Sequence, residues 1–389
     1  MFHKAEKMTE PTKEVIKQIY KKRKQKVAEY LSSHEIGAAV FIDSEARREP
    51  AIRYLTGHPS DAVLIVFDNG KDILIPWDEI LARRQAFFDK LIPYTKYKNS
   101  ELQAVQANLN AAKGIGSMKA ELPPSVPYPD FLSFIDALPQ WDVRCRQNGV
   151  HQYVTELRMI KDDYEIACIK EAARVGDVIA EKIEQEIRSG AIKTEIDAAL
   201  FIERELRKNG CERTGFDTLA AGPERSWAIH AFPGYTSGEW PGHGLSILDF
   251  GVVYKGYTSD MTITVAKGPL SEAQEKLLDL VQAAYDECLL LYKKDIPVKN
   301  AADRADSIFA AAKRKMPHTL GHAIGLEIHE YPRISNKMTE DVVFKPGMIV
   351  TLEPGLYDEQ LGGVRLENDV LITESGNEVI THSKILRIE

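Results

Sequence analysis

The chain has 389 residues, of which 44% are hydrophobic and 28% are charged, a composition typical of folded globular proteins and not of disordered or fibrous ones. Its net charge of -8 gives no general attraction to nucleic acid, so we expect no nucleic-acid partner. No apolar run reaches the ~20 residues that cross a bilayer, and the first residues contain no apolar signal segment. The four cysteines are widely separated, which favours reduced thiols. We therefore expect a cytoplasmic protein with no membrane partner, and the length predicts two domains.

The first predicted domain, residues 1–152, alternates helical and strand patterns. Apolar side chains recur at helical spacing over residues 12–32. The basic run 21–24 inside this helix has two interpretations, a nucleic-acid or import patch or a solvated helix face, and we favour the second. Three strand-like runs follow, AAVFI, AVLIVF and KDILIPW, and then a helical pattern in DEILARRQAFFDKL. This alternation predicts a small α/β domain.

The second predicted domain, residues 153–389, has a different texture. A long helical pattern opens near Val154, and a second helix is predicted from Thr194 to Asn209. From residue 214 onward strands and glycine-rich loops predominate, with helices expected near 271–293 and 298–315. The polar residues suited to chemistry are concentrated in this domain.

A predicted hairpin brings two aspartates together. A two-residue turn at 255–256 would place Thr262 opposite Asp249, with Asp260 on the same face as Asp249. Centring the turn one residue earlier would place the two aspartates directly opposite, and either register puts their Cβ atoms roughly 5–8 Å apart. Two such carboxylates repel unless a cation or protons lie between them. Alternatively, one faces solvent and the other caps a turn, and an irregular loop would break the alternation.

Three of the ten histidines, His318, His322 and His329, fall within twelve positions. Gly321 and Gly325 allow tight bends there, so this segment is not a helical HExxH motif. A lone histidine is usually a satisfied polar group, whereas three together among glycines and apolar residues favour a functional site.

Two acidic segments follow. Glu353 ends an apolar strand that Pro-Gly stops, and in a strand Arg365, Glu367 and Asp369 would share one face. Alternatively, these residues have no catalytic role and Arg365 simply forms an ion pair with one carboxylate. Such a pair contributes little to stability if it is exposed.

Four carboxylates and one imidazole form an oxygen-rich set of candidate metal ligands: Asp249, Asp260, His322, Glu353 and Glu367. Such a set suits manganese, zinc or cobalt. Two metal ions about 3.5–4 Å apart need bridging carboxylates and can share one hydroxide.

The ordered motifs LDFG, SDMT, GHAIGLEIHE, LEPG and GVRLEND resemble those of the pita-bread metallopeptidases, which include Xaa-Pro aminopeptidases, prolidases and methionine aminopeptidases. AIRYLTGHPSD resembles the N-terminal domain of the proline-specific and creatinase-like members. The resemblance implies an α+β fold, in which a creatinase-type α/β domain precedes a pita-bread catalytic domain with a curved antiparallel sheet. It also implies a homodimer.

The same resemblance implies roles for the metal ligands. Asp249 would bind one ion, Asp260 and Glu367 would bridge both ions, and His322 and Glu353 would complete the other ion. Glu353 would also handle the proton of the bridging water.

Four further residues match family positions that do not bind metal. His230 and His329 would steady the substrate carbonyl and the tetrahedral intermediate, and His318 and Arg365 would orient the ligands.

The implied activity is hydrolysis of the N-terminal Xaa-Pro bond of short peptides by a metal-bridging hydroxide. Two divalent ions per chain are expected, with manganese preferred over zinc and cobalt. Xaa-Pro dipeptidase and Xaa-Pro aminopeptidase both stay open. The alternatives on the same fold are a creatinase-like amidinohydrolase and a non-catalytic binding module, in both of which we would expect ligands to be lost.

Overall fold

The computed structural model describes residues 11–112, 116–338 and 341–389. The chain divides into two compact units, one that ends at Arg158 and one that runs from Met159 to Glu389. The boundary that we expected between residues 152 and 153 lies inside helix α6 (Val150–Met159), with which the first unit ends. Among the described residues, no helix combines the length and hydrophobicity needed to cross a membrane.

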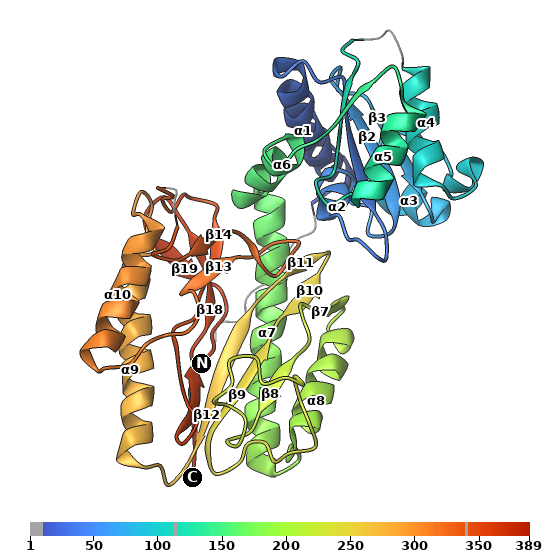
Figure 1. The fold of residues 1–389 in the computed structure, drawn as a ribbon. Helices are drawn as coiled ribbons and strands as arrows, with labels where there is room; N and C mark the ends of the chain where they lie inside the picture. Colours follow the sequence, from blue (N-terminus) through green and yellow to red (C-terminus); the bar gives the residue numbers. More distant parts are fainter. Residues whose placement is uncertain (1–10, 113–115, 339–340) are drawn as a thin grey trace. The chain divides into compact units, whose positions relative to one another are not determined.

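The N-terminal unit is built around a mixed six-stranded sheet (Figure 1). In spatial order its strands are β4 (Lys90–Leu91), β3 (Asp72–Pro76), β2 (Ala62–Phe67), β1 (Ala38–Asp43), β5 (Lys119–Leu122) and β6 (Asp142–Cys145). The other helices of this unit are α1 (Lys13–Ser33), α2 (Pro50–Thr56), α3 (Glu79–Gln85), α4 (Glu101–Ala111) and α5 (Tyr128–Ala137), with a 3-10 helix at Tyr94–Tyr97. The predicted α/β alternation is therefore confirmed. Helix α3 is shorter than expected, because the residues after it pair with β3 as strand β4.

The basic run 21–24 on α1 is only partly solvated. Its first two residues are exposed, whereas Arg23 and Lys24 are buried. Arg23 Nη1 donates to the carbonyl of Tyr54 at 2.9 Å, and Lys24 forms an ion pair with Asp72 of β3. The interpretation as a solvated face was wrong for these two residues, because their charges are used inside the N-terminal unit.

The C-terminal unit combines helices with short, mostly antiparallel sheets. Its described helices are α7 (Asp163–Ser189), α8 (Glu195–Lys208), α9 (Glu272–Leu289) and α10 (Val298–Ala311). One sheet has the order β20 (Ile385–Ile388), β12 (Met261–Lys267), β9 (Gly244–Phe250) and β8 (Leu219–Ala221), and a smaller sheet has the order β11 (Tyr257–Thr258), β10 (Val252–Tyr254) and β7 (Arg213–Thr214). Another has the order β14 (Glu330–Ile334), β13 (Gly321–Ala323), β15 (Ile349–Leu352), β18 (Asn368–Ile372) and β19 (Asn377–Val379), and β16 (Gly355–Asp358) pairs with β17 (Gly362–Arg365).

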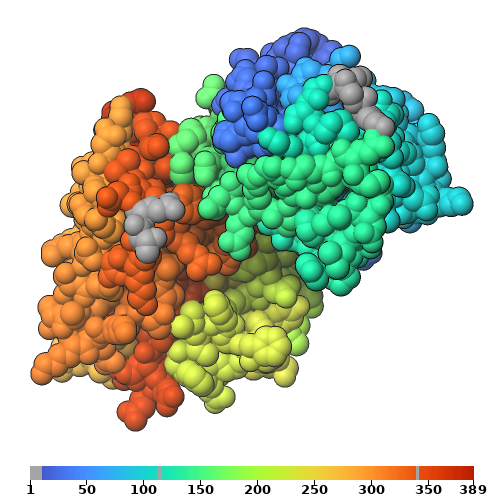
Figure 2. Space-filling view, turned by 45° about the horizontal axis from the view of Figure 1, so that its top comes forward, coloured from blue at the N-terminus to red at the C-terminus, as the bar shows by residue number. Residues whose placement is uncertain are grey.

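Two helix pairs flank these strands on opposite sides (Figure 1). Helices α7 and α8 pack on β9 and β12 through an apolar cluster that includes Ile202 and Leu248. Helices α9 and α10 pack on β13, β15 and β18 through a second cluster that includes Phe309 and Val350. In the space-filling view the two flanks are visible as a yellow-green and an orange surface (Figure 2). The strands between the flanks supply the candidate site.

The helical pattern expected from Val154 onward is interrupted, so that α6 and α7 are separate helices. Asp162 caps α7 in a capping box, in which its side chain accepts from the Glu165 amide and the Asp162 amide donates to the Glu165 carboxylate. The residue before this cap, Lys161, is buried and lies 3.2 Å from the carboxylate of Glu330. The break therefore anchors the start of α7 to strand β14.

Candidate active site

Strands β9 and β12 belong to the hairpin that the sequence predicts. The turn residues 255–256 have positive φ angles of 50° and 88°, as a type I′ turn requires, and the ladder pairs Asp249 with Thr262. Asp260 directly precedes β12, and both aspartates line the same cavity. The two-residue turn register is confirmed, and the register with the aspartates directly opposite does not occur.

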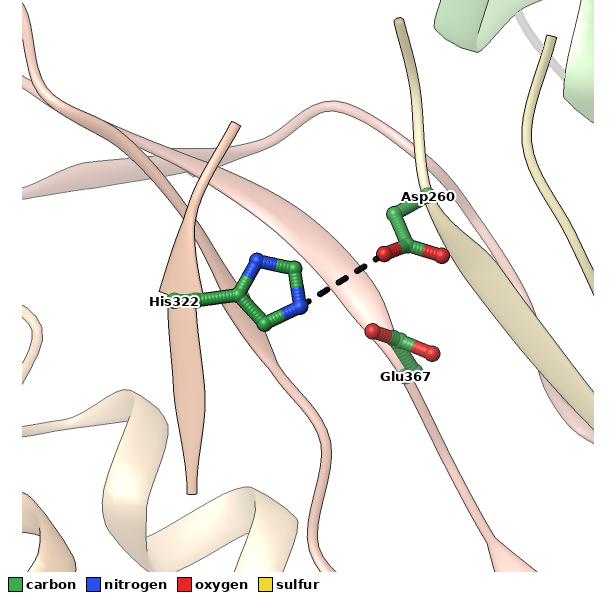
Figure 3. Close-up of side chains that lie close together, drawn as sticks. All are labelled: Asp260, His322 and Glu367. Carbon is green, nitrogen blue, oxygen red and sulfur yellow. Dashed lines mark ion pairs between the residues drawn. The ribbon is translucent and has the colours of Figure 1, made fainter. Parts of the chain in front are cut away.

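Three further donors come from the C-terminal strands. His322 lies in β13, Glu353 directly follows β15, and Glu367 lies between β17 and β18. Donor atoms of Asp260, His322 and Glu367 lie within 4.8 Å of one another, and their side chains point toward a common centre (Figure 3). His322 Nε2 is 3.7 Å from Asp260 Oδ2 and 3.5 Å from Glu353 Oε1. The fold thus gathers residues that are more than a hundred positions apart.

All nine residues that the sequence indicated line one cavity of about 470 Å³. They are Asp249, Asp260, His322, Glu353, Glu367, His230, His318, His329 and Arg365. Phe216, Ile229, Thr319, Ile328 and Arg333 also line the cavity, although none of them was expected as a site residue from the sequence. The volume falls within the range of small-molecule sites.

Burial and mutual repulsion perturb the acidic groups of the cavity. Burial, with the neighbouring Glu367 and Asp249, raises the pKa of Asp260 well above its usual range. Burial also raises the pKa of Glu353 to about 8, and burial together with Glu353 raises the pKa of Glu367. So many acidic groups in one cavity require compensating positive charge, from protons or from a cation.

The carboxylate oxygens and the imidazole of the cavity fit divalent metal ions. Two buried oxygens, Asp249 Oδ1 and Asp260 Oδ1, accept no hydrogen bond from any described residue, and such a buried acceptor is costly. Burial lowers the pKa of His322 to about 3, so its imidazole is neutral at pH 7 and can donate a nitrogen lone pair to a metal. Carboxylate oxygens with one imidazole suit manganese, zinc or cobalt.

Arg365 is buried at the centre of a hydrogen-bond network. Its Nη2 donates to Asp249 Oδ2 at 2.6 Å, and its Nη1 donates to the Tyr357 hydroxyl at 2.6 Å. His318 Nε2 lies 3.0 Å from the same hydroxyl, which links the histidine to the arginine. The pairing of Arg365 with a carboxylate is therefore confirmed, but the pair is buried and not exposed.

Tyr357 is the member of this network that the sequence interpretation missed. Burial raises its pKa to about 12, so it stays a neutral phenol. One signal was available, because LYDEQLGGVR reads as a tight hairpin. In that hairpin Gly355 of β16 pairs with Arg365 of β17. Tyr357 lies two residues from Gly355 and therefore shares the face of the hairpin that carries Arg365.

Neutral groups hold the other carboxylates. Thr262 Oγ1 donates to Glu367 Oε2 at 2.6 Å, and Thr351 Oγ1 donates to Glu353 Oε1 at 3.4 Å. These bonds orient the carboxylates toward the cavity.

His230 and His329 lie at the wall of the cavity with exposed side chains. The rings of His329 and His322 are 4.3 Å apart between centroids. Although part of the His329 side chain is exposed, partial desolvation of its ring by the cavity wall, with Arg333 nearby, lowers its pKa, which favours a neutral imidazole at pH 7. His230 lies in the long connection between β8 and β9, a part of the chain with little regular structure.

Known proteins resemble this chain in sequence and in fold. An Xaa-Pro dipeptidase of Pyrococcus horikoshii is 29% identical over 369 residues, which cover 94% of this chain and 98% of that protein. The X-Pro aminopeptidase from Thermotoga maritima superposes with a TM-score of 0.81 at 24% identity, covering 94% of this chain and 99% of the other. An Xaa-Pro dipeptidase from Bacillus anthracis superposes with a TM-score of 0.80 at 25% identity, covering 95% and 100%.

These structural likenesses extend over nearly the whole chain and confirm the predicted α+β fold. The sequence profile of metallopeptidase family M24 matches residues 167–374, more than half of the chain, and this stretch contains all the candidate metal ligands. The family implies a hydrolase that uses divalent metal ions. The chain therefore belongs to metallopeptidase family M24.

Proposed function

We propose that this chain hydrolyses the bond between an N-terminal residue and proline in short peptides, using two divalent metal ions. The observation that carries the proposal is the set of four carboxylates and one imidazole in a single cavity. In this set Asp249 Oδ1 and Asp260 Oδ1 accept no hydrogen bond from any described residue. The names of the relatives, Xaa-Pro dipeptidase and X-Pro aminopeptidase, support proline at the second position of the substrate.

Five side chains hold the metal ions in this proposal. Asp249 would bind one ion, Asp260 and Glu367 would be shared by both ions, and His322 and Glu353 would complete the other. When bound, two divalent ions, for which we propose manganese over zinc or cobalt, supply a hydroxide nucleophile at neutral pH and polarise the scissile carbonyl.

The surrounding side chains manage protons and the developing charge. Glu353 would be ionised once the ions are bound, so its carboxylate could take the proton of the nucleophile and pass it to the leaving amine. His230 and His329 donate hydrogen bonds to the oxyanion, and such preorganised donors are each worth about 3–4 kcal/mol in the transition state. Arg365 and His318, joined through Tyr357, keep Asp249 in place.

We further propose a cytoplasmic homodimer, with residues 1–152 as a creatinase-type domain and residues 153–389 as the catalytic domain. Similarity of the Pyrococcus horikoshii dipeptidase along 94% of this chain supports the domain assignment. Gel filtration with light scattering tests the dimer.

The proposed activity is tested by release of products from Ala-Pro and Ala-Pro-Ala after metal is stripped and Mn²⁺ is restored. Cleavage of Ala-Pro alone would identify a dipeptidase, and release of alanine from Ala-Pro-Ala would identify an aminopeptidase. Creatine, offered in parallel, tests an amidinohydrolase. If Mn²⁺ is bound and none of the three is hydrolysed, the proline proposal fails and a binding role gains support.

A further inference from the structure

The connection between β8 and β9 carries His230 and is held from a distance by α8. We call residues 222–241 the His230 segment. It contains little regular secondary structure, yet it must present His230 at the wall of the cavity. Glu195, the first residue of α8, is 1% exposed and points its carboxylate into this segment.

Four donors from the His230 segment converge on Glu195. Gly222 N donates to Glu195 Oε1 at 2.8 Å, and the amide and hydroxyl of Thr236 each donate to Glu195 Oε2 at 2.6 Å. The guanidinium of Arg225 forms an ion pair with the same oxygen. A buried carboxylate with this many donors is a strong anchor, because hydrogen bonds to a charged acceptor are stronger than neutral ones.

Arg225 connects Glu195 to the residues that follow His230. Its Nη2 donates to the carbonyl oxygens of Ala231 and Pro233. Ala231 has a φ of +36°, a left-handed conformation that a residue with a side chain rarely adopts and that surrounding contacts must maintain. The arginine therefore holds the chain where its backbone is strained.

The other side of His230 is tied to the network at the candidate metal site. Arg365 Nη1 donates to the carbonyl of Ile229 at 3.3 Å, and Arg365 also binds Asp249. The carbonyls on both sides of His230 thus bind an arginine, one anchored on Asp249 and one anchored on Glu195 in α8.

We propose that Glu195 and Arg225 form a positioning pair, which fixes His230 relative to the metal site by holding the Ala231 and Pro233 carbonyls. This inference rests on the catalytic role proposed above for His230. Neither Glu195 nor Arg225 is among the residues that line the cavity, so the pair acts through His230 and not on the substrate.

The first test is kinetic and uses the full-length, Mn²⁺-loaded enzyme with whichever of Ala-Pro and Ala-Pro-Ala it cleaves. Arg225→Met and Glu195→Gln are expected to lower kcat by roughly 10–100-fold, because a displacement of a catalytic group by about 1 Å can slow the reaction by that factor. KM and bound metal are expected to stay within threefold of wild type. Arg225→Lys retains the charge without the planar fork, and its kcat is expected to lie between that of Arg225→Met and that of wild type.

Glu205→Gln is the matched control. Glu205 is also a buried carboxylate of α8, and it accepts from Lys182 Nζ and Lys208 Nζ at 2.7 Å. Within the described part of the chain, its side chain makes no hydrogen bond to the His230 segment. Its kcat is expected within twofold of wild type. An equal loss in Glu205→Gln would mean that general damage to α8 explains the effect, and the positioning pair would be overturned.

A double variant separates positioning from a plain structural role. If Arg225 acts through His230, adding Arg225→Met to His230→Ala lowers kcat by less than a further twofold. Additive losses would overturn the proposal.

Hydrogen exchange of the His230 segment, measured without substrate, does not depend on the proposed activity. Its amides are expected to exchange at least fivefold faster in Arg225→Met, or in Arg225→Lys if the first variant does not fold, and at the wild-type rate in Glu205→Gln. Wild-type exchange in the arginine variants would overturn the positioning pair even in an active peptidase. A chain that cleaves neither peptide would refute the proposed function and leave this measurement valid.

Discussion

Thr262→Val removes one hydroxyl from the candidate metal site while it nearly preserves side-chain volume. Thr262 Oγ1 donates to Glu367 Oε2 at 2.6 Å and accepts from Arg365 Nε at 3.0 Å, so it joins a candidate ligand to the arginine that holds Asp249. Thr262 is completely buried, which leaves little room for a replacement water. The variant therefore tests whether the network around the carboxylates matters for metal binding.

The expected magnitude follows from these two bonds. Each has a charged partner, and hydrogen bonds to charged groups contribute about 1.5–3 kcal/mol. Loss of a partner that orients a metal ligand typically costs 10–100-fold in metal affinity, which equals about 1.4–2.8 kcal/mol. The direction is the same for protons, because the Thr262 bond lowers the pKa of Glu367 and its loss lets a proton compete better with the metal. We expect Mn²⁺ to bind 10–100-fold more weakly.

Thr264→Val is the matched control for this measurement. Thr264 is also completely buried in β12, but its hydroxyl donates to the carbonyl of Arg365 at 2.8 Å and accepts from the Arg365 amide at 3.0 Å. It therefore supports backbone and not a carboxylate, and we expect a loss of about 1–2 kcal/mol in unfolding free energy with Mn²⁺ affinity within threefold of wild type. Competition with a fluorescent chelator measures both affinities. Equal losses of affinity in the two variants, or wild-type affinity in Thr262→Val, would refute the reasoning.

Three further predictions concern the candidate site and two buried groups outside it. His329→Ala is expected to keep two metal ions per chain and lose orders of magnitude in kcat, whereas Asp260→Ala should lose metal in elemental analysis; full activity in both would contradict the site assignment. Burial lowers the pKa of His151 to about 3, so below pH 6.5 the unfolded chain gains a proton that the folded one does not, and stability present at pH 7 should fall by about 2 kcal/mol at pH 5. Hydrogen exchange of β1 in wild type and His151→Leu checks this, and an equal pH dependence in both would count against it. Lys161→Met removes the ammonium 3.2 Å from buried Glu330 and is expected to cost about 3–5 kcal/mol, with partial recovery in Lys161→Met/Glu330→Gln by denaturant unfolding.

The hairpin register was predictable because it depends on local chemistry. A two-residue turn fixes which residues face each other, and Gly256 supplies one of the two positive φ angles that the turn needs. Period-two alternation then carries the pairing from the turn to Asp249 and Thr262. Helix α8 was predictable for the same reason, since Thr194 caps its start and Gly210, with a φ of +81°, follows its end.

Features that depend on distant partners were not predictable from local patterns. Arg23 and Lys24 follow the helical spacing of α1 like surface residues, and only the acceptors supplied by Tyr54 and Asp72 explain their burial. The break before α7 stands in a continuous apolar periodicity. Its capping box, Asp162 and Glu165, is a local signal, but the contact of Lys161 with a strand far along the chain is not. Single-sequence periodicity carries no information on such contacts.

The candidate site shows how both kinds of information combine. Its acidic residues are unfavourable in buried strands, so the sequence itself signals that local stability is given up for another purpose. The residues that restrain them are ordinary by comparison: Thr262 is a common strand residue, and Tyr357 is one of fifteen tyrosines. Repelling carboxylates can therefore be recognised in a sequence because they conflict with their surroundings, whereas the groups that orient them conflict with nothing. The positioning residues are accordingly the part of such a site for which a structure is indispensable.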